Sequence, residues 1–249
     1  MPLIALAAIA GRLPAQAPPA DSLAKTRPPI IRTWEAVGIG GAVTIAALLD
    51  PDVRSLFQTE RSPFTNDAAT VGNSFGHAAT VGPALAATWL VGAIAGKREV
   101  SNAALWAAGA GTAAGVVTAG LKFVFGRSRP PHNLTYDFHP FTSNASFPSG
   151  HTSFSFAIAS SLAHATKDRW SDVGFYAGAA LTGLSRINDD KHWFSDVVGG
   201  AALGILVGRQ LTGGRAGRRA TGGTEVRTGS LGNIRPLIGA GVVGISAEF

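Results

Sequence analysis

The fold is decided by residues 185–196, which read Ser-Arg-Ile-Asn-Asp-Asp-Lys-His-Trp-Phe-Ser-Asp. This polar stretch separates two apolar runs, Val173–Leu184 and Val197–Val207, which predict two helices. On the second helix, His192 and Asp196 stand four positions apart and share a face. The carboxylate can therefore hold one ring nitrogen and leave the other free to attack or to accept a proton. The alternative interpretation is a loop between two buried helices with a surface His-Asp pair.

Composition favours closely packed helices. The chain has 249 residues, enough for one domain with a sizeable core, and contains 32 glycines and 46% hydrophobic but only 14% charged residues. Such use of small residues is typical of membrane helix bundles. The absence of cysteine excludes disulfides and thiolate metal sites. The net charge of +6 comes from basic residues between apolar segments, without interleaved aromatic residues, so we expect no nucleic-acid partner.

The N-terminal region resembles a secretory signal. An apolar run followed by Ala15-Gln16-Ala17 predicts a cleaved signal peptide over residues 1–17. The match is imperfect because no Lys or Arg precedes the run and Arg12 follows it. Residues 18–31 are rich in proline and predict a linker.

Residues 32–210 predict an all-α domain, a bundle of six helices read from apolar runs and their breakers. The predicted helices cover residues 33–49, 77–95, 101–125, 151–165, 172–184 and 192–210. Only the second and third contain uncharged stretches long enough to span a bilayer. These lengths alone leave open whether the bundle lies in a membrane or in water.

The distribution of basic residues favours the membrane. If the six helices alternate in direction, the basic residues at 97–98, 167–169 and 209–219 fall on one side, together with those before the first helix. This asymmetry fits the positive-inside rule with both chain ends in the cytoplasm, whereas a cleaved signal would leave the N-terminus outside. Two expectations stay open: a membrane protein whose active end faces the periplasm of a bacterial-type envelope, and an exported, soluble periplasmic protein.

The C-terminal region differs in composition from the bundle. Residues 211–223 are rich in Gly, Arg and Thr and predict a flexible linker. Within residues 224–249, apolar residues alternate with Gly, Ser and Glu, which predicts a short β-hairpin.

Two further polar clusters lie between the third and fourth helices. Residues 122–130 read Lys-Phe-Val-Phe-Gly-Arg-Ser-Arg-Pro, and residues 147–152 read Phe-Pro-Ser-Gly-His-Thr. The second cluster precedes an apolar helix, so its backbone N–H groups can form an anion site at a helix N-terminus. In an alternating bundle, both clusters reach the same end as residues 185–196. Three cations, a helix N-terminus and two histidines around one point would suit a phosphate group.

These blocks resemble the signature of the type 2 phosphatidic acid phosphatase (PAP2) superfamily, the histidine phosphatases related to vanadium haloperoxidases. The signature is Lys-x6-Arg-Pro, Pro-Ser-Gly-His and Ser-Arg-x5-His-x3-Asp, and all three blocks occur complete and in the family's order between Lys122 and Asp196. Each block alone would be weak, but the three together are specific.

The resemblance implies a role for each matching residue. His192 would be the nucleophile, Asp196 would orient it, and His151 would protonate the leaving alcohol and later activate water. The phosphoryl oxygens would be bound by Lys122, Arg129, Ser149, Gly150 and Arg186. No cofactor or metal is implied, and vanadate would bind as a mimic of phosphate or of the transition state. We interpret Arg127 as a solvated charge at a helix end, and Asp189 and Asp190 as a solvated loop face.

The resemblance also implies the reaction: hydrolysis of phosphate monoesters or pyrophosphates through a phosphohistidine. A membrane location favours lipid phosphates such as phosphatidate or isoprenoid pyrophosphates, and a soluble one favours a broad-specificity acid phosphatase. A vanadium-dependent haloperoxidase is a second class, disfavoured because those enzymes are typically longer. A transporter or an inactive binding module is a third, disfavoured because the motifs are complete and the polar residues gather at one end of the helices.

Overall fold

Helices form the main body of the protein. The computed structural model describes residues 31–132, 135–166, 168–220, 235–239 and 242–246. The elements in chain order are α1 (Thr33–Leu48), α2 (Asp50–Thr59), α3 (Pro63–Gly76), α4 (Ala78–Ile94), α5 (Arg98–Phe125), a 3-10 turn (Pro130–His132), α6 (Gly150–Thr166), α7 (Arg169–Asn188), α8 (Phe194–Ala220), β1 (Arg235–Gly239) and β2 (Val242–Ser246). The two strands pair antiparallel, with Arg235 opposite Ser246. The predicted signal peptide lies outside the described residues, as does all but residue 31 of the Pro-rich linker.

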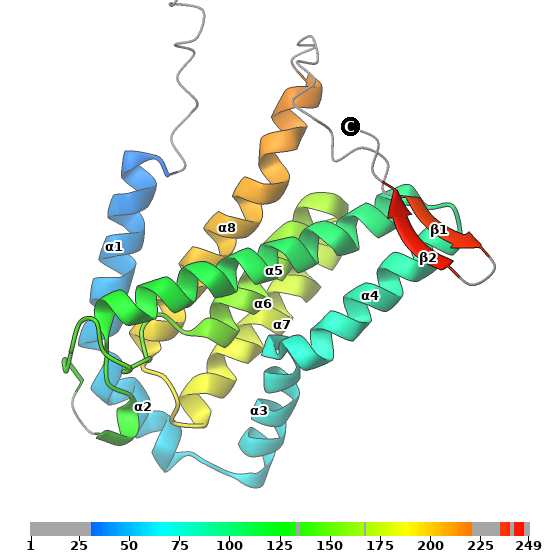
Figure 1. Ribbon diagram of the computed structural model, residues 1–249. Helices are drawn as coiled ribbons and strands as arrows, with labels where there is room; N and C mark the ends of the chain where they lie inside the picture. The colour runs from blue at the N-terminus through cyan, green and yellow to red at the C-terminus, as the bar shows by residue number, and fades with distance from the viewer. Residues whose placement is uncertain (1–30, 133–134, 167, 221–234, 240–241, 247–249) are drawn as a thin grey trace, which may run out of the picture.

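Two helices, α2 and α3, lie in a stretch for which the sequence predicted none. Helix α1 ends at Leu48 because Pro51 has no N–H to continue the ladder, and α2 leaves it at an angle of 54°. Helix α3 begins with a cap, in which Ser62 Oγ accepts the N–H of Thr65. It meets α4 at His77 with an angle of 55°. The predicted count of six therefore becomes eight α-helices in the described part, four of them in two bent pairs (Figure 1).

Glycines on α8 bring that helix into backbone contact with α6. A Cβ atom built on Gly200, Gly204 or Gly208 would lie 2.5–2.7 Å from a backbone carbonyl oxygen of α6 or of the residue before it. The oxygens belong to Ser149, Ser153 and Ala157. Every fourth residue of α8 thus lacks a side chain where α6 passes, as in small-residue helix contacts of membrane proteins. Because Gly200 faces Ser149, this contact also sets the start of α8 against the start of α6.

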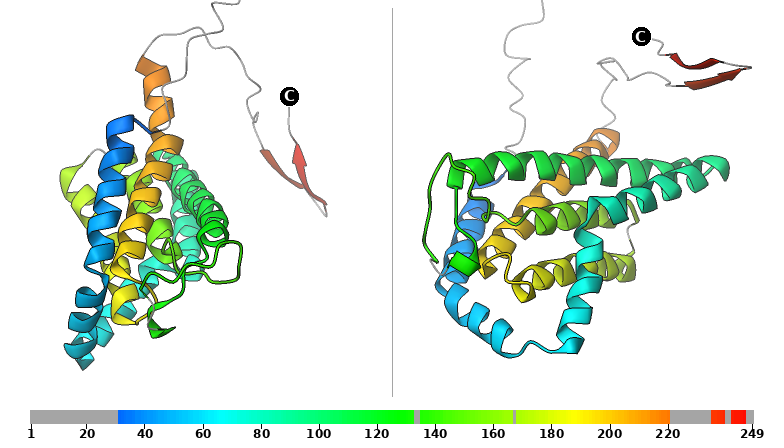
Figure 2. Two further views of the ribbon diagram at one scale, coloured as in Figure 1. Left: turned by 90° about the vertical axis from the view of Figure 1, so that its left-hand side faces the viewer. Right: turned by 60° about the horizontal axis from the view of Figure 1, so that its bottom comes forward.

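The same end of the bundle receives four helix termini and one long connection. Helices α5 and α7 end there, α6 and α8 begin there, and the connection from α5 to α6 runs across it in its described residues, 126–132 and 135–149 (Figures 1 and 2). Helix α1 lies along α8, and Glu35 and Arg209 form an ion pair of 2.8 Å between them (Figure 2). The arrangement places the three polar clusters of the sequence at one end of the molecule.

One described helix has the length and composition of a membrane span, and two bent pairs of helices reach them together. Among the described residues, α5 alone qualifies as a single helix, and the bent pairs α1–α2 and α3–α4 raise the number to three if each is one span. Large apolar side chains point outward on these segments. Among them, Val37 on α1, Ile94 on α4 and Val116 on α5 are 70%, 78% and 69% exposed. Such surfaces are costly in water and are stable against lipid tails.

Candidate active site

The predicted nucleophile lies in the connection between α7 and α8, and its partner lies in the first turn of α8. His192 is 5% exposed and Asp196 is fully buried. His192 Nδ1 lies 3.4 Å from Asp196 Oδ2. The carboxylate accepts an N–H only from a protonated Nδ1, so Nε2 carries the lone pair that can attack. The two side chains meet as the sequence predicted, although His192 lies before α8 and not on its face.

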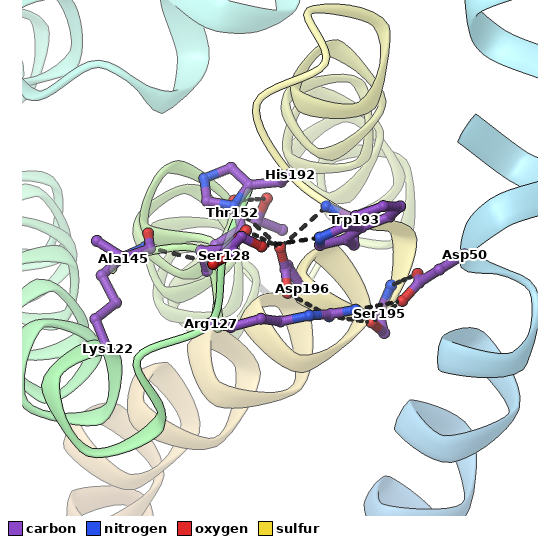
Figure 3. Close-up of polar contacts among 12 residues, drawn as sticks. Asp50, Lys122, Arg127, Ser128, Ala145, Thr152, His192, Trp193, Ser195 and Asp196 are labelled. Atoms are coloured by element: carbon purple, nitrogen blue, oxygen red, sulfur yellow. Dashed lines mark hydrogen bonds and ion pairs between the residues drawn. The ribbon is translucent and has the colours of Figure 1, made fainter. Parts of the chain in front are cut away.

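Asp196 is held by several other donors. Its Oδ2 accepts the backbone N–H of Trp193 at 3.0 Å and the hydroxyl of Ser146, and its Oδ1 accepts Nη1 of Arg127 at 2.7 Å (Figure 3). The indole N–H of Trp193 in turn donates to the carbonyl of Ser128 at 3.0 Å. The orientation of Asp196 is therefore fixed by donors on both sides: Trp193 just before α8, and Arg127 and Ser146 in the connection between α5 and α6.

Burial lowers the pKa of His192 below the ordinary 6.5, because the charged imidazolium loses its hydration. The hydrogen bond and charge of Asp196 oppose this shift, whereas the nearby cations Lys122 and Arg129 add to it. The balance leaves His192 neutral at neutral pH, which is the nucleophilic form.

His151 lies at the N-terminus of α6, close to the same group of charges. Burial and the charges of Arg186, His77, His192 and Lys122 lower its pKa to about 4. Its ring meets that of His77 edge to face, with 4.6 Å between centroids. A phosphate dianion bound among these cations would offset the positive field and favour protonation of His151, which donation to a leaving group requires.

The three predicted cations lie at the end of α5, on the connection after it and at the end of α7. Lys122, in the last turn of α5, donates through Nζ to the carbonyl oxygens of Ala145 and Ser146 (Figure 3). Arg186 is 7% exposed, and its Nη2 lies 2.6 Å from Asp189 Oδ2. Arg129 is exposed on the connection after α5. Lys122 and Arg186 are thus positioned by their own contacts, while Arg129 is not so constrained.

The Pro-Ser-Gly-His block forms the start of α6. Ser149 is fully buried, its N–H donates to the backbone carbonyl of Asp196 at 2.9 Å, and its hydroxyl accepts from Thr152 at 3.0 Å. Gly150 begins the helix, where backbone N–H groups have no partner within the helix. A Cβ on Gly150 would lie 3.7 Å from Lys122 Cε, so the backbone here adjoins the lysine side chain. The block therefore joins α6, α8 and Lys122 at one point.

The interpretation of Arg127 as a solvated charge is wrong. Its side chain is 2% exposed and lies between the carboxylates of Asp50 and Asp196. Gly126, with φ of 57°, turns the chain sharply at the end of α5, and a Cβ there would lie 1.7 Å from the carbonyl oxygen of His139. This turn directs Arg127 inward, which the spacing of the block did not indicate.

The loop carboxylates are also paired rather than simply solvated. Asp189 accepts from Arg186 and, at 2.8 Å, from the side chain of Asn73 on α3. Asp190 accepts two hydrogen bonds from Arg54 on α2, at 2.7 and 2.8 Å. The partners Asn73 and Arg54 lie more than a hundred residues away in the chain, within the helices that the sequence did not predict.

Other residues near the site were missed or were given no role. Asp50, fully buried at the start of α2, was not singled out, although an acidic residue that ends an apolar helix is a signal of its own. His77 lies at the bend between α3 and α4, against His151. His139 pairs with Asp137 at 2.7 Å, and His164 is exposed in the last turn of α6.

The comparisons with known proteins agree with these motifs. The family model of the PAP2 superfamily matches residues 103–214, which include all three blocks. The part of the chain that carries the three blocks matches the PAP2 superfamily. Over 115 residues it is 43% identical to a lipid A 1-phosphatase of Porphyromonas gingivalis, an alignment that covers 45% of this chain and 23% of the relative. The chain thus spans about a quarter of the length of that curated relative.

Two solved structures resemble this chain. LpxE of Aquifex aeolicus is 27% identical, with a TM-score of 0.53 over 66% of this chain and 94% of its own. A transmembrane PAP2 type phosphatidylglycerolphosphate phosphatase of Bacillus subtilis is 21% identical, with a TM-score of 0.58 over 74% of this chain and 98% of its own. The second likeness shows a shared fold.

Proposed function

We propose that this protein is a phosphatase that hydrolyses a phosphate monoester or pyrophosphate carried by a membrane lipid. The observation that carries the proposal is the buried His192–Asp196 pair, placed beside His151 and within the field of Lys122 and Arg129. A nucleophile, a proton donor and cations around one point are the parts that phosphoryl transfer requires.

In the first step of the proposed mechanism, Nε2 of His192 attacks phosphorus and the bond from phosphorus to the ester oxygen breaks. His151 gives its proton to that oxygen, so that the alcohol leaves neutral. Asp196 accepts the Nδ1–H throughout and stabilises the positive charge that grows on the ring. Lys122, Arg129, Arg186, Ser149 and the N–H of Gly150 would bind the phosphoryl oxygens.

In the second step, His151 takes a proton from water, and the resulting hydroxide attacks the phosphohistidine. The bond between Nε2 and phosphorus breaks, its electron pair returns to His192, and inorganic phosphate leaves. The proton count closes because His151 ends the cycle protonated, as it began. No residue in this sequence of steps needs a metal ion, so we propose a metal-independent reaction that vanadate inhibits as a mimic of the transition state.

A lipid substrate is supported by the surface of the protein and by its relatives. The candidate spans carry outward apolar side chains, and an apolar groove of about 390 Å³ between α2, α3 and α7 reaches Ser185, the neighbour of Arg186. The relatives named a lipid A 1-phosphatase and a phosphatidylglycerolphosphate phosphatase make phosphorylated lipid headgroups the first substrates to test. Apolar surfaces of this kind are not expected on a soluble acid phosphatase, because soluble proteins rarely expose large apolar patches to water.

The test measures phosphate release in detergent with EDTA, from a lipid phosphate and from a water-soluble aryl phosphate. Wild type should release phosphate from the lipid faster, and His192→Ala should lose at least about a thousandfold in rate, as expected when a nucleophile is removed. His164→Ala is the matched control, because His164 is exposed at the far end of α6. Full activity in His192→Ala would refute the mechanism, and a preference for the aryl phosphate would refute the lipid assignment.

A further inference from the structure

Arg127 lies beneath the catalytic pair and joins two buried carboxylates. Its Nη1 is 2.7 Å from Asp196 Oδ1, and its Nη2 is 2.7 Å from Asp50 Oδ2. Figure 3 shows the guanidinium extending from the connection after α5 between α8 and α2. A guanidinium presents donors in a fixed planar fork, so it can hold two carboxylates in a set relative geometry where a lysine cannot.

Asp50 completes the arrangement from the side of α2. Its Oδ1 accepts the backbone N–H of Ser195 at 2.8 Å, and its Oδ2 accepts the Ser195 hydroxyl at 2.6 Å. Ser195 also accepts Nη1 of Arg127 at 2.7 Å. The remaining donors of Arg127 are used as well, since Nε and Nη2 donate to the carbonyl of Thr135 at 3.2 and 2.7 Å. The first turn of α8, which carries Asp196, is thus bound to α2 through a fully hydrogen-bonded network.

We propose that Arg127 and Asp50 are positioning residues for the nucleophile. They hold Asp196 in the orientation that accepts the Nδ1–H of His192, and this aims Nε2 at the phosphorus atom. The proposal rests on the proposed function, because it assigns to these two residues a part in the same reaction. Neither residue touches the substrate; both act through Asp196.

The charges of the network explain why a second carboxylate is needed. Arg127 alone would neutralise Asp196 and weaken its attraction for a positive imidazole. With Asp50 included, two carboxylates and one guanidinium carry a net charge of minus one within a fully buried cluster. In a poorly hydrated interior, that charge stabilises the positive ring that forms when His192 is phosphorylated.

The test uses Asp50→Asn, which keeps the size of the side chain, and Arg127→Lys, which keeps the charge but loses the fork. In both variants kcat should fall about a hundredfold, the loss typical of a displaced reacting group, while KM stays within about twofold.

Arg54→Lys is the matched control. Arg54 also joins α2 to the loop before α8, and it stacks on Trp193 at 5.6 Å as Arg127 does at 5.5 Å, but it binds Asp190 instead of Asp196. Its kcat should be that of wild type.

A second readout separates positioning from loss of structure and from failure of the proposed function. In the ¹⁵N spectrum of histidine-labelled protein in detergent, the signals absent from His192→Gln belong to His192. Wild type should show a single Nδ1-protonated tautomer, and Asp50→Asn should show a mixture of tautomers while retaining the other five histidine signals. Unchanged kcat with an unchanged tautomer in Asp50→Asn would overturn the proposal. A wild type without phosphatase activity whose tautomer still depends on Asp50 would refute the function and leave the positioning role in place.

Discussion

At the scale of single residues, the proposed mechanism needs opposite protonation states of two histidines, whereas the site lowers the pKa of both. His192 must be neutral to attack, and its burial beside Lys122 and Arg129 keeps it so. His151 must be protonated to donate, yet its burial and the nearby charges, that of Arg186 first, lower its pKa to about 4. The proton on His151 therefore has to arrive with a bound phosphate group, whose negative charge offsets the cations. Binding of the phosphate group and protonation of His151 are therefore coupled by their charges.

The pH dependence should reflect the lowered pKa of His192. Because the neutral form attacks and the pKa lies below 6.5, the acid-side decline in kcat/KM should occur below pH 6.5, and activity should persist in mildly acidic solution. Ionisation of the substrate also affects the profile, so two aryl phosphates with different phosphate pKa values are compared. The decline that both share belongs to the enzyme, and a shared acid-side decline above pH 6.5 would contradict this assignment.

The role of His151 predicts a dependence on the leaving group. His151→Asn should slow hydrolysis of a lipid phosphate by about 10²–10⁴-fold, the usual contribution of a general acid. An aryl phosphate whose phenol is acidic needs no proton to leave, so its first step should be slowed far less. Single-turnover measurements of alcohol or phenol release on both substrates test this difference. Equal losses on the two substrates would argue against proton donation.

The sequence predicted most of the proposed site residues, but it did not predict the buried contacts of Arg127 that hold Asp196. The pairing of His192 with Asp196 was predicted from spacing on one helix, and the two side chains do meet, although His192 lies two residues before α8 begins. The meeting of the three blocks was predicted from alternating helices. Arg127 was misread because its contact with Asp50 spans 77 positions and depends on the turn at Gly126. A long-range contact of this kind leaves no periodic signal in a single sequence.

At the scale of helices, the contact between α6 and α8 determines where His151 and His192, the proposed catalytic histidines, lie. The glycines at 200, 204 and 208 let α8 approach the backbone of α6, and this fixes the start of each helix against the other. Apolar runs predicted both helices, although the sequence did not indicate which faces meet. Helices α2 and α3 were missed because their sequences are more polar and lack a long apolar run.

Gly204→Ala tests this helix contact. Its Cβ would lie 2.5 Å from the carbonyl oxygen of Ser153, so the helices must separate, at a cost of about 1–3 kcal/mol for overpacking. We expect a lower melting temperature in detergent and reduced activity. Gly174→Ala on α7 is the control, because no atom lies within 4 Å of its Cβ and alanine favours a helix. Equal melting temperatures for the two variants would show that α6 and α8 can adjust at no cost.

At the scale of the whole molecule, the two ends of the bundle differ in character. One end holds the proposed site and the bent pairs' polar helix termini, and the opposite end carries the turns at Lys97 and Arg169 and the Arg209–Glu35 pair. Basic residues next to candidate spans remain in the cytoplasm by the positive-inside rule. We therefore propose that the site faces the periplasm, where the phosphate groups of outer-leaflet lipids would reach it.

Single-cysteine labelling in intact cells tests this orientation directly, because the chain contains no native cysteine. Ser143→Cys lies on the exposed connection at the site end, and Lys97→Cys lies on the exposed turn between α4 and α5. A membrane-impermeant maleimide added to spheroplasts should label Ser143→Cys alone, and both variants should be labelled after the membrane is permeabilised. Labelling of Lys97→Cys alone in spheroplasts would invert the orientation and place the reaction in the cytoplasm. Release of both variants into the soluble fraction would replace the membrane assignment with an exported, soluble enzyme.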